Sequence, residues 1–157
     1  MMKKLLFGFI FSLICSTPAL AGWQYTTDVD EMRGNTSYYG VLSNETNSKL
    51  DDEKLNIILF SPDDELITSM EIQTLKSPIN CTSSNCKALV KFGDNPIETI
   101  LYAVVTPERN FIVPIEYMEF VRKIKNSEVV YIELPIEGKG TQQFKFKTAG
   151  LKWEVEQ

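Results

Sequence analysis

Alternation between apolar and polar residues dominates the chain and predicts a fold built mostly of β-strands. The segment 55–60 (LNIILF) is a short apolar run that ends at a turn rich in Ser, Pro and Asp. In the segments 66–75 and 142–147, apolar or β-branched residues alternate with polar ones, which is the two-residue period of a half-buried strand. Further segments with strand composition are 23–27, 36–43, 86–92, 97–105, 111–113 and 128–134.

One segment, 114–126, has the period of an amphipathic helix instead. Its apolar stripe contains Ile115, Met118, Val121 and Ile124. Glutamates stand early in the segment and basic residues stand late, which suits the helix dipole. Pro114 is tolerated in a first helical turn, because that position has no intrahelical N–H partner to lose. The sequence therefore predicts one helix over about 114–126.

About eight short strands, with turns roughly every 8–12 residues, predict a mostly β fold: an antiparallel β-sandwich or an open barrel. The single amphipathic helix is expected to cover an open end or an edge of the sheet. No internal repeat or low-complexity stretch interrupts the chain. Residues 22–157 are therefore predicted to form a single β-rich domain.

Residues 1–21 have the layout of an export signal. Two lysines precede an apolar stretch of about a dozen residues, and Ala19 and Ala21 form an Ala-x-Ala cleavage site. That stretch is shorter than the ~20 residues that span a bilayer. We expect cleavage after Ala21, a periplasmic or secreted protein, and no membrane span after cleavage. The alternatives are an uncleaved anchor and a lipoprotein modified at Cys15, although Ile14 is larger than the usual residue before a lipidated cysteine.

Charge and composition narrow the classes of function. The chain has 16 basic and 21 acidic residues, a net charge of −5, which argues against nucleic acid as a partner because phosphates require a basic surface. It has no histidine, which removes Ser-His-Asp and Cys-His nucleophile systems and most transition-metal sites. No Gly-rich phosphate loop is present. We therefore expect no cofactor, no metal and no enzymatic activity.

Cleavage would leave two cysteines, Cys81 and Cys86, and an even number in an exported chain predicts a disulfide. The four polar residues between them predict that the bridge closes the turn of a hairpin. A redox-active pair is the alternative, but the spacing is not Cys-x-x-Cys. A zinc site would need more ligands than two thiols in a chain without histidine.

The carboxylates are the remaining candidates for chemistry. Two acidic turns flank the segment 55–60: Asp51, Asp52 and Glu53 before it, and Asp63, Asp64 and Glu65 after it. If the two turns converged, they would bind calcium or act as an acid–base pair. The favoured interpretation is two solvated turns, because neither contains the alternating oxygen ligands and the glycine of a calcium-binding loop.

Three groups of side chains are candidates for binding another protein. Tyr38 and Tyr39 fall on opposite faces of a strand, so one ring is expected to be exposed. Arg33 follows an acidic turn predicted at 28–31, and a surface ion pair is its alternative role. Lys145 and Lys147 point outward from a late strand. With Lys139 and Lys152 they form a basic strip that would meet an acidic partner or block aggregation at a sheet edge.

Short motifs across the chain resemble a known group of proteins. After Trp23 these are DEMRGNT at 30–36, Cys-x4-Cys at 81–86 with VKFG at 90–93, and QQFKF at 142–146 with Gly-Leu-x-Trp at 150–153. Together they resemble small exported proteins of proteobacteria and their prophages that mostly carry no assigned function. The layout is also distantly similar to periplasmic accessory proteins of type VI secretion (the VasI/TagO group), from which the cysteine spacing departs. This resemblance implies an exported, β-rich protein and no particular activity.

The functional expectation is a non-enzymatic periplasmic protein-binding module. It would be accessory to an envelope or secretion machine, or an immunity-type factor of mobile-element origin, and its partner would be another envelope or periplasmic protein. The alternative is a cell-wall enzyme, or an inhibitor of one that inserts a loop such as 82–85. A purely structural envelope subunit is a third possibility, and it predicts self-association.

Overall fold

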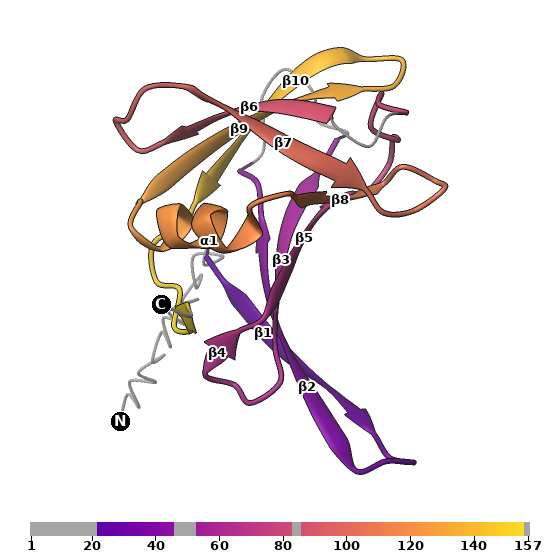
Figure 1. The fold of residues 1–157 in the computed structure, drawn as a ribbon, viewed down its shortest axis with the longest axis vertical. Helices are drawn as coiled ribbons and strands as arrows, with labels where there is room; N and C mark the ends of the chain where they lie inside the picture. The colour runs from indigo at the N-terminus through magenta and orange to yellow at the C-terminus, as the bar shows by residue number, and fades with distance from the viewer. Residues whose placement is uncertain (1–21, 46–52, 83–85, 156–157) are drawn as a thin grey trace, which may run out of the picture.

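The structure is a computed structural model that describes residues 22–45, 53–82 and 86–155. Within these ranges it contains a nine-strand antiparallel sheet, a two-strand parallel sheet and one helix (Figure 1). The predicted mostly β fold with one helix in the C-terminal half is confirmed. The predicted export signal, residues 1–21, lies outside the described residues.

The strands of the large sheet are β1 (Gln24–Asp30), β2 (Asn35–Ser43), β3 (Leu55–Ser61), β5 (Ser69–Thr74), β6 (Cys86–Phe92), β7 (Glu98–Val104), β8 (Phe111–Pro114), β9 (Val129–Ile136) and β10 (Gly140–Lys147). The small sheet pairs β4 (Leu66–Ile67) with β11 (Glu154–Val155), and the helix α1 is Tyr117–Lys125. In the described part of the chain, no helix has the length and apolarity needed to cross a membrane.

The strand order is β1-β2-β3-β5-β8-β7-β6-β9-β10. The short strand β8 joins the two halves of the sheet, because it pairs with β5 on one side and with β7 on the other. In Figure 1 the half that contains β6, β7 and β9 crosses over the half that contains β3 and β5. One continuous ladder thus supplies both walls of the core, and the sheet stays open.

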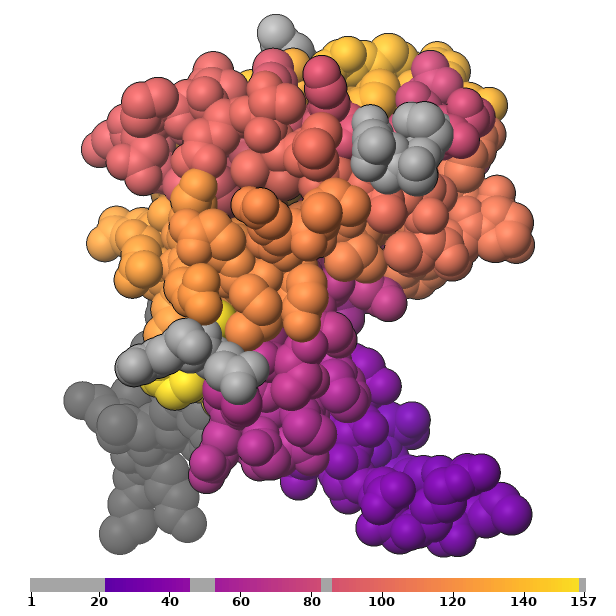
Figure 2. Space-filling view, viewed as in Figure 1, coloured from indigo at the N-terminus to yellow at the C-terminus, as the bar shows by residue number. Residues whose placement is uncertain are grey.

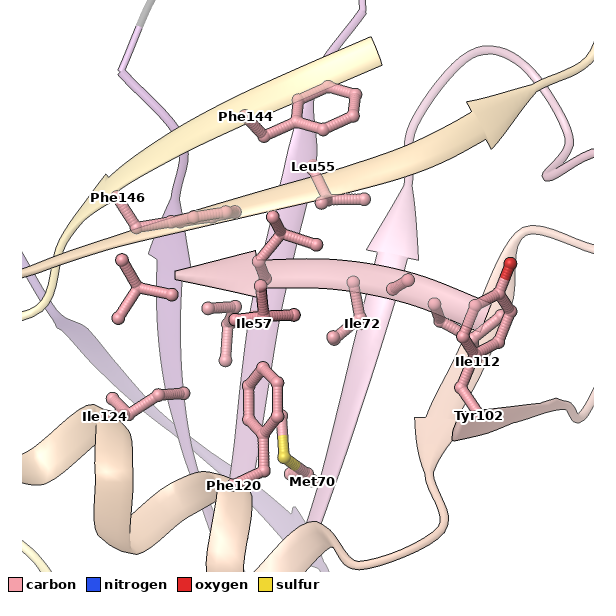
Figure 3. Packing of buried hydrophobic residues seen from close by; sticks show 14 of the residues in the cluster. Leu55, Ile57, Met70, Ile72, Tyr102, Ile112, Phe120, Ile124, Phe144 and Phe146 are labelled. Carbon is pink, nitrogen blue, oxygen red and sulfur yellow. The ribbon is translucent and has the colours of Figure 1, made fainter. Parts of the chain in front are cut away.

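The core fills the space between these two halves and α1. Inward positions alternate along the strands as the sequence predicts, so Phe144 and Phe146 are 3% and 0% exposed. Figure 3 shows Phe120 of α1 pointing from the helix toward Ile57 and Met70. Each fully buried large apolar side chain contributes about 1.5–3 kcal/mol as an upper estimate. The helix is therefore held to the sheet by its apolar face.

Helix α1 begins at Tyr117, whereas the sequence predicts that it begins three residues earlier, at Pro114. Pro114 is the last residue of β8 and lies opposite Tyr102. The N–H of Ile115 then donates to the carbonyl oxygen of Leu101 at 2.9 Å, so the strand ladder keeps this segment extended. Ile115 is 53% exposed as a result, and its predicted place on the buried helical stripe is wrong.

The disulfide between Cys81 and Cys86 is present, with a Cα–Cα distance of 6.1 Å. Its predicted place in a hairpin turn is wrong, because β6 pairs with β7 and β9 while β5 pairs with β3 and β8. Before the disulfide, Ile79 pairs with Ile136 of β9, beyond the point where β6 leaves that strand. The bridge therefore links the segment that follows Ile79 to the first residue of β6. Residues 83–85, between the two cysteines, lie outside the described residues.

Candidate functional site

A two-strand arm, residues 28–37, projects from the sheet and is indigo in Figures 1 and 2. Strand β2 pairs with β3 only from Tyr38 to Ser43, so the arm has no third strand beside it. Among the described residues, the hydrogen bonds and the ion pair of this segment all join members of the arm. A hairpin of two strands is marginally stable in water by itself. The arm therefore lacks the neighbouring strand that stabilises the rest of the sheet.

The turn at the tip of the arm occupies 31–34, not 28–31 as predicted, because Asp28 and Asp30 pair with Ser37 and Asn35 inside the ladder. Gly34 permits this turn, since its φ of 70° is a conformation that L side chains rarely adopt. Because the turn lies three residues later in the chain than predicted, the arm is longer and Met32 lies at its tip.

Asp30 fixes the conformation of the tip. Its Oδ1 accepts hydrogen bonds from the backbone N–H groups of Met32 and Arg33, both at 3.1 Å. Its Oδ2 accepts one from Nη1 of Arg33 at 2.9 Å, which forms the predicted surface ion pair. The hydrogen bond from the Arg33 side chain is the main cause that lowers the pKa of Asp30, and the two backbone N–H groups add to it. Arg33 therefore serves as part of the turn and still exposes its side chain.

Apolar side chains are exposed on the arm. Met32 is 88% exposed and Val29 is 55% exposed. Methionine is flexible and polarizable, which suits it to contact with an irregular apolar surface. Sequence reasoning singled out Arg33 and missed these two residues, although an apolar residue inside a charged turn is a signal that could have found them.

Tyr38 and Tyr39 lie at the base of the arm, and both are half-buried. The prediction that one ring is exposed is therefore wrong. The ring of Tyr39 packs against that of Phe60, with centroids 5.6 Å apart, and Tyr38 packs against the core. These contacts follow from the pairing of β2 with β3, and they anchor the arm to the sheet.

The predicted basic strip is matched by carboxylates of the same chain. Lys145 and Lys147 both contact Glu45, at 2.9 Å and 2.7 Å, and hydrogen bonds from the two ammonium groups lower the pKa of this carboxyl. The other two pairs are Lys139 with Glu53 at 2.8 Å and Lys152 with Asp64 at 2.7 Å. Strand β10 is an edge of the sheet, as the edge-blocking interpretation assumes. The strip is therefore not a free basic surface.

The acidic turns are used for internal contacts. Asp63 Oδ1 accepts hydrogen bonds from the Ser61 hydroxyl and from the N–H groups of Glu65 and Leu66. Asp64 Oδ1 accepts one from Nε1 of Trp153 at 3.0 Å.

Of the first acidic turn, Glu53 is buried and paired, while Asp51 and Asp52 lie outside the described residues. Glu53 bonds to Lys139, Lys76 and Ser77, whereas Asp64 bonds to Lys152 and Trp153, so the two carboxylates have separate partners. Within the described ranges, no group of three or more Cys, Asp or Glu residues is arranged to hold a metal ion.

A groove lies between β7 and α1, where the salmon and orange surfaces meet in Figure 2. Its volume is about 260 Å³. Its lining consists of Glu98, Thr99, Ile100 and Leu101 from β7, Ile115, and Glu116, Glu119, Phe120 and Lys123 on the helix side. An ion pair between Lys123 and Glu98 at 2.5 Å crosses it, while Leu101 and Ile115 are 43% and 53% exposed. The groove therefore combines apolar surface with charged side chains, and sequence reasoning missed it.

Comparison with protein-family models, with curated proteins and with solved structures finds no match to this chain. The basis for a functional proposal is therefore the chain itself, above all the arm and the groove.

Proposed function

We propose that the protein is a non-enzymatic protein-binding module of the cell envelope, and that the arm, residues 28–37, is its docking element. The observation that carries this proposal is the isolation of the arm: its ten residues extend past the end of β3 with no third strand beside them, and Met32 is 88% exposed. A two-strand hairpin of this kind is only marginally stable in water by itself. Contact with a partner would bury the apolar tip and supply the missing neighbour.

The chemistry of the arm indicates what the partner surface contains. Met32 and Val29 require an apolar depression, because buried apolar area is the main source of affinity at the centre of an interface. Asp28, Asp30 and Glu31 outnumber the single basic residue Arg33, so the arm carries a net negative charge. A basic rim around the depression would complement that charge and speed association.

The compartment is part of the same proposal. The layout of residues 1–21, with Ala19 and Ala21 at the end, supports export, and the disulfide between Cys81 and Cys86 is consistent with an oxidising environment. The partner would then be another envelope or periplasmic protein. The module would be accessory to an envelope or secretion machine, or an immunity-type factor of mobile-element origin.

The test is a pull-down from a periplasmic extract with a variant that lacks the arm. Asp28 and Ser37 are direct partners in the ladder, so an Asn-Gly loop in place of 29–36 closes a shorter hairpin in the same register. We expect one protein to be retained by the native chain and lost by this variant. Equal retention by both chains at matched folding would contradict the proposal.

One observation favours a second candidate, an inhibitor of a cell-wall enzyme. The arm is only two strands wide and ends in exposed side chains, a shape that fits an active-site cleft. The loop 82–85, considered for this role from the sequence, lies mostly outside the described residues. Hydrolysis of cell-wall fragments by an envelope extract distinguishes the candidates: an inhibitor slows it, and the arm-shortened variant does not.

A further inference from the structure

We propose that the groove between β7 and α1 binds an extended, basic peptide segment of another protein, which adds as a strand to the free edge of β7. This inference does not depend on the arm, because it uses other residues and a different mode of recognition. Addition of a strand to an exposed sheet edge is a common way in which proteins hold peptides, since the backbone supplies much of the affinity.

The edge of β7 is free at its beginning. Strand β8 pairs with β7 only between Tyr102 and Val104, and the N–H of Ile115 then donates to the carbonyl oxygen of Leu101. After this bond the chain turns away to form α1. The part of β7 before Leu101 therefore has β6 on one side and the groove on the other.

The direction of the backbone groups in β7 follows from its ladder. Along an antiparallel strand, successive residues direct their N–H and C=O groups to alternate sides. The N–H of Val105 donates to the carbonyl oxygen of Phe111, and the carbonyl oxygen of Leu101 accepts from the N–H of Ile115. The odd-numbered residues of β7 therefore bond toward the β8 side. By the same alternation, the N–H and C=O groups of Thr99 point into the groove.

The hydrogen bonds of the neighbouring strand β6 lead independently to the same direction for the backbone groups of Thr99. The N–H of Gly93, which directly follows β6, donates to the carbonyl oxygen of Val129, so the odd-numbered residues of β6 bond toward β9. Leu89 and Thr99 are opposite each other but are therefore not a hydrogen-bonded pair. Among the described residues, no segment of chain pairs with the groove-facing side of Thr99. One donor and one acceptor are thus available to a peptide.

Helix α1 forms the second wall of the groove. Glu116, Glu119, Phe120 and Lys123 recur every three or four residues and so lie on one side of the helix. Phe120 is buried beneath this wall, while Leu101 and Ile115 remain exposed beside it. A peptide strand alternates its side chains, so every second residue can place an apolar group against these three residues.

Charge selects a basic peptide. Three carboxylates line the groove, and two of them are paired: Glu98 with Lys123 at 2.5 Å and Glu119 with Arg122 at 3.2 Å. The side chain of Glu116 has no partner among the described residues. It is exposed and stands next to Ile115. A lysine or arginine of the peptide would pair with Glu116 while its apolar neighbour enters the groove.

The test uses three capped hexapeptides in which lysine alternates with valine, leucine or phenylalanine. They are titrated into protein purified after expression of the full chain, and amide hydrogen exchange is followed by NMR. We expect at least one peptide to bind, with the exchange of the Thr99 amide slowed about tenfold at saturation. N-methylation of alternate peptide bonds should weaken binding by about tenfold, because it removes the backbone hydrogen bonds. A glutamate-for-lysine peptide should not bind.

Variants of the protein test the same contacts from the other side. Thr99→Pro removes an N–H group that faces the groove and makes no hydrogen bond to β6. We therefore expect the sheet to tolerate the substitution and peptide binding to weaken. Leu101→Asp and Glu116→Lys should each weaken binding at least about fivefold. Their matched controls, Leu75→Asp and Glu108→Lys, change exposed residues outside the groove and should leave binding unchanged.

Three results would overturn the proposal. In the first, none of the peptides alters the amide signals of Thr99, Leu101 or Phe120. In the second, the N-methylated peptide binds as well as its parent. In the third, the free protein already protects Thr99 and self-associates in a way that Leu101→Asp abolishes, which identifies a second copy of the chain as the occupant. Loss of the arm affects none of these readouts, so failure here and failure of the arm are distinguishable.

Discussion

The carboxylate of Glu53 is fully buried and forms an ion pair with the ammonium group of Lys139 at 2.8 Å, although 86 positions separate the two residues in the chain. The backbone N–H groups of Lys76 and Ser77 also donate to it. Glu53 precedes β3 and Lys139 lies in the turn between β9 and β10, so this pair joins the two halves of the sheet where they come together. A buried carboxylate is tolerable here because its oxygens are paired.

Removal of the cation should destabilise the fold. Lys139→Met keeps much of the side chain but removes the cation, so the Glu53 carboxylate keeps only its hydrogen bonds from Lys76 and Ser77. We therefore expect the free energy of unfolding to fall by about 2 kcal/mol. Urea denaturation at pH 7 measures this change. Lys87→Met is the matched control, because Lys87 is exposed on β6, and it should change stability by less than about 0.5 kcal/mol. A loss no larger than that of the control would show that the pair contributes little.

The pH dependence of stability should reflect the same carboxyl. Burial acts to raise the pKa of Glu53, but hydrogen bonds from Lys139, Ser77 and the backbone outweigh it, and the net pKa lies below the usual 4.5. The stability from this group is therefore present above the unfolded pKa, and it is lost as the pH falls through the folded pKa. Urea titrations between pH 7 and pH 3 should show a smaller acid-induced loss in Glu53→Gln than in the native protein. Parallel curves for the two proteins would contradict this assignment.

A buried hydroxyl gives a prediction of the opposite sign. Tyr102 is 1% exposed, and its hydroxyl has no hydrogen-bond partner among the described residues. Tyr102→Phe removes that polar group and should raise the free energy of unfolding by about 1 kcal/mol. Burial raises the pKa of Tyr102 to about 12, so in the native protein stability is retained below pH 10 and falls as the pH rises toward 12. The phenylalanine variant should lack this alkaline component, and a less stable variant at pH 7 would refute the account.

The ring of Trp153 packs so close to the backbone at Gly40 that a larger residue there would crowd it. A Cβ atom at this position would lie 3.1 Å from the ring of Trp153 and 3.3 Å from that of Tyr25. Gly40→Val should displace the buried Trp153 ring, shift its fluorescence to the red and cost about 2 kcal/mol. Gly22→Ala is the control, because a Cβ there meets nothing within 4 Å. An unchanged emission spectrum in the valine variant would contradict this packing.

Much of the fold could be predicted from local pattern. The alternation that places Phe144 and Phe146 inward is visible in the sequence because a strand buries every second residue. The helical face containing Val121 and Ile124 is visible for the analogous reason. Local pattern places Ile115 on the helical stripe, but the hydrogen bond from its N–H to the carbonyl oxygen of Leu101 depends on β7, a separate strand that local pattern does not reveal.

The candidate surfaces depend on pairings that sequence pattern does not specify. The sequence predicts that Lys145 and Lys147 belong to a free basic strip, because only the folded chain brings Glu45 into contact with both. The arm exists because β3 ends opposite Tyr38, and the groove exists because β8 leaves β7 early. Strand order and strand length decide both features, and many orders suit the same alternation.

The most direct test of the arm as a docking element is photo-crosslinking from its tip. A photoreactive amino acid is introduced at Met32 or, as the control, at Glu108, an exposed residue of the turn between β7 and β8. Cells of the organism that encodes the protein are irradiated, and adducts are identified by mass spectrometry. We predict one dominant protein adduct from position 32 and none of the same mass from position 108. No adduct from position 32, or the same adducts from both positions, would contradict a docking role for the arm.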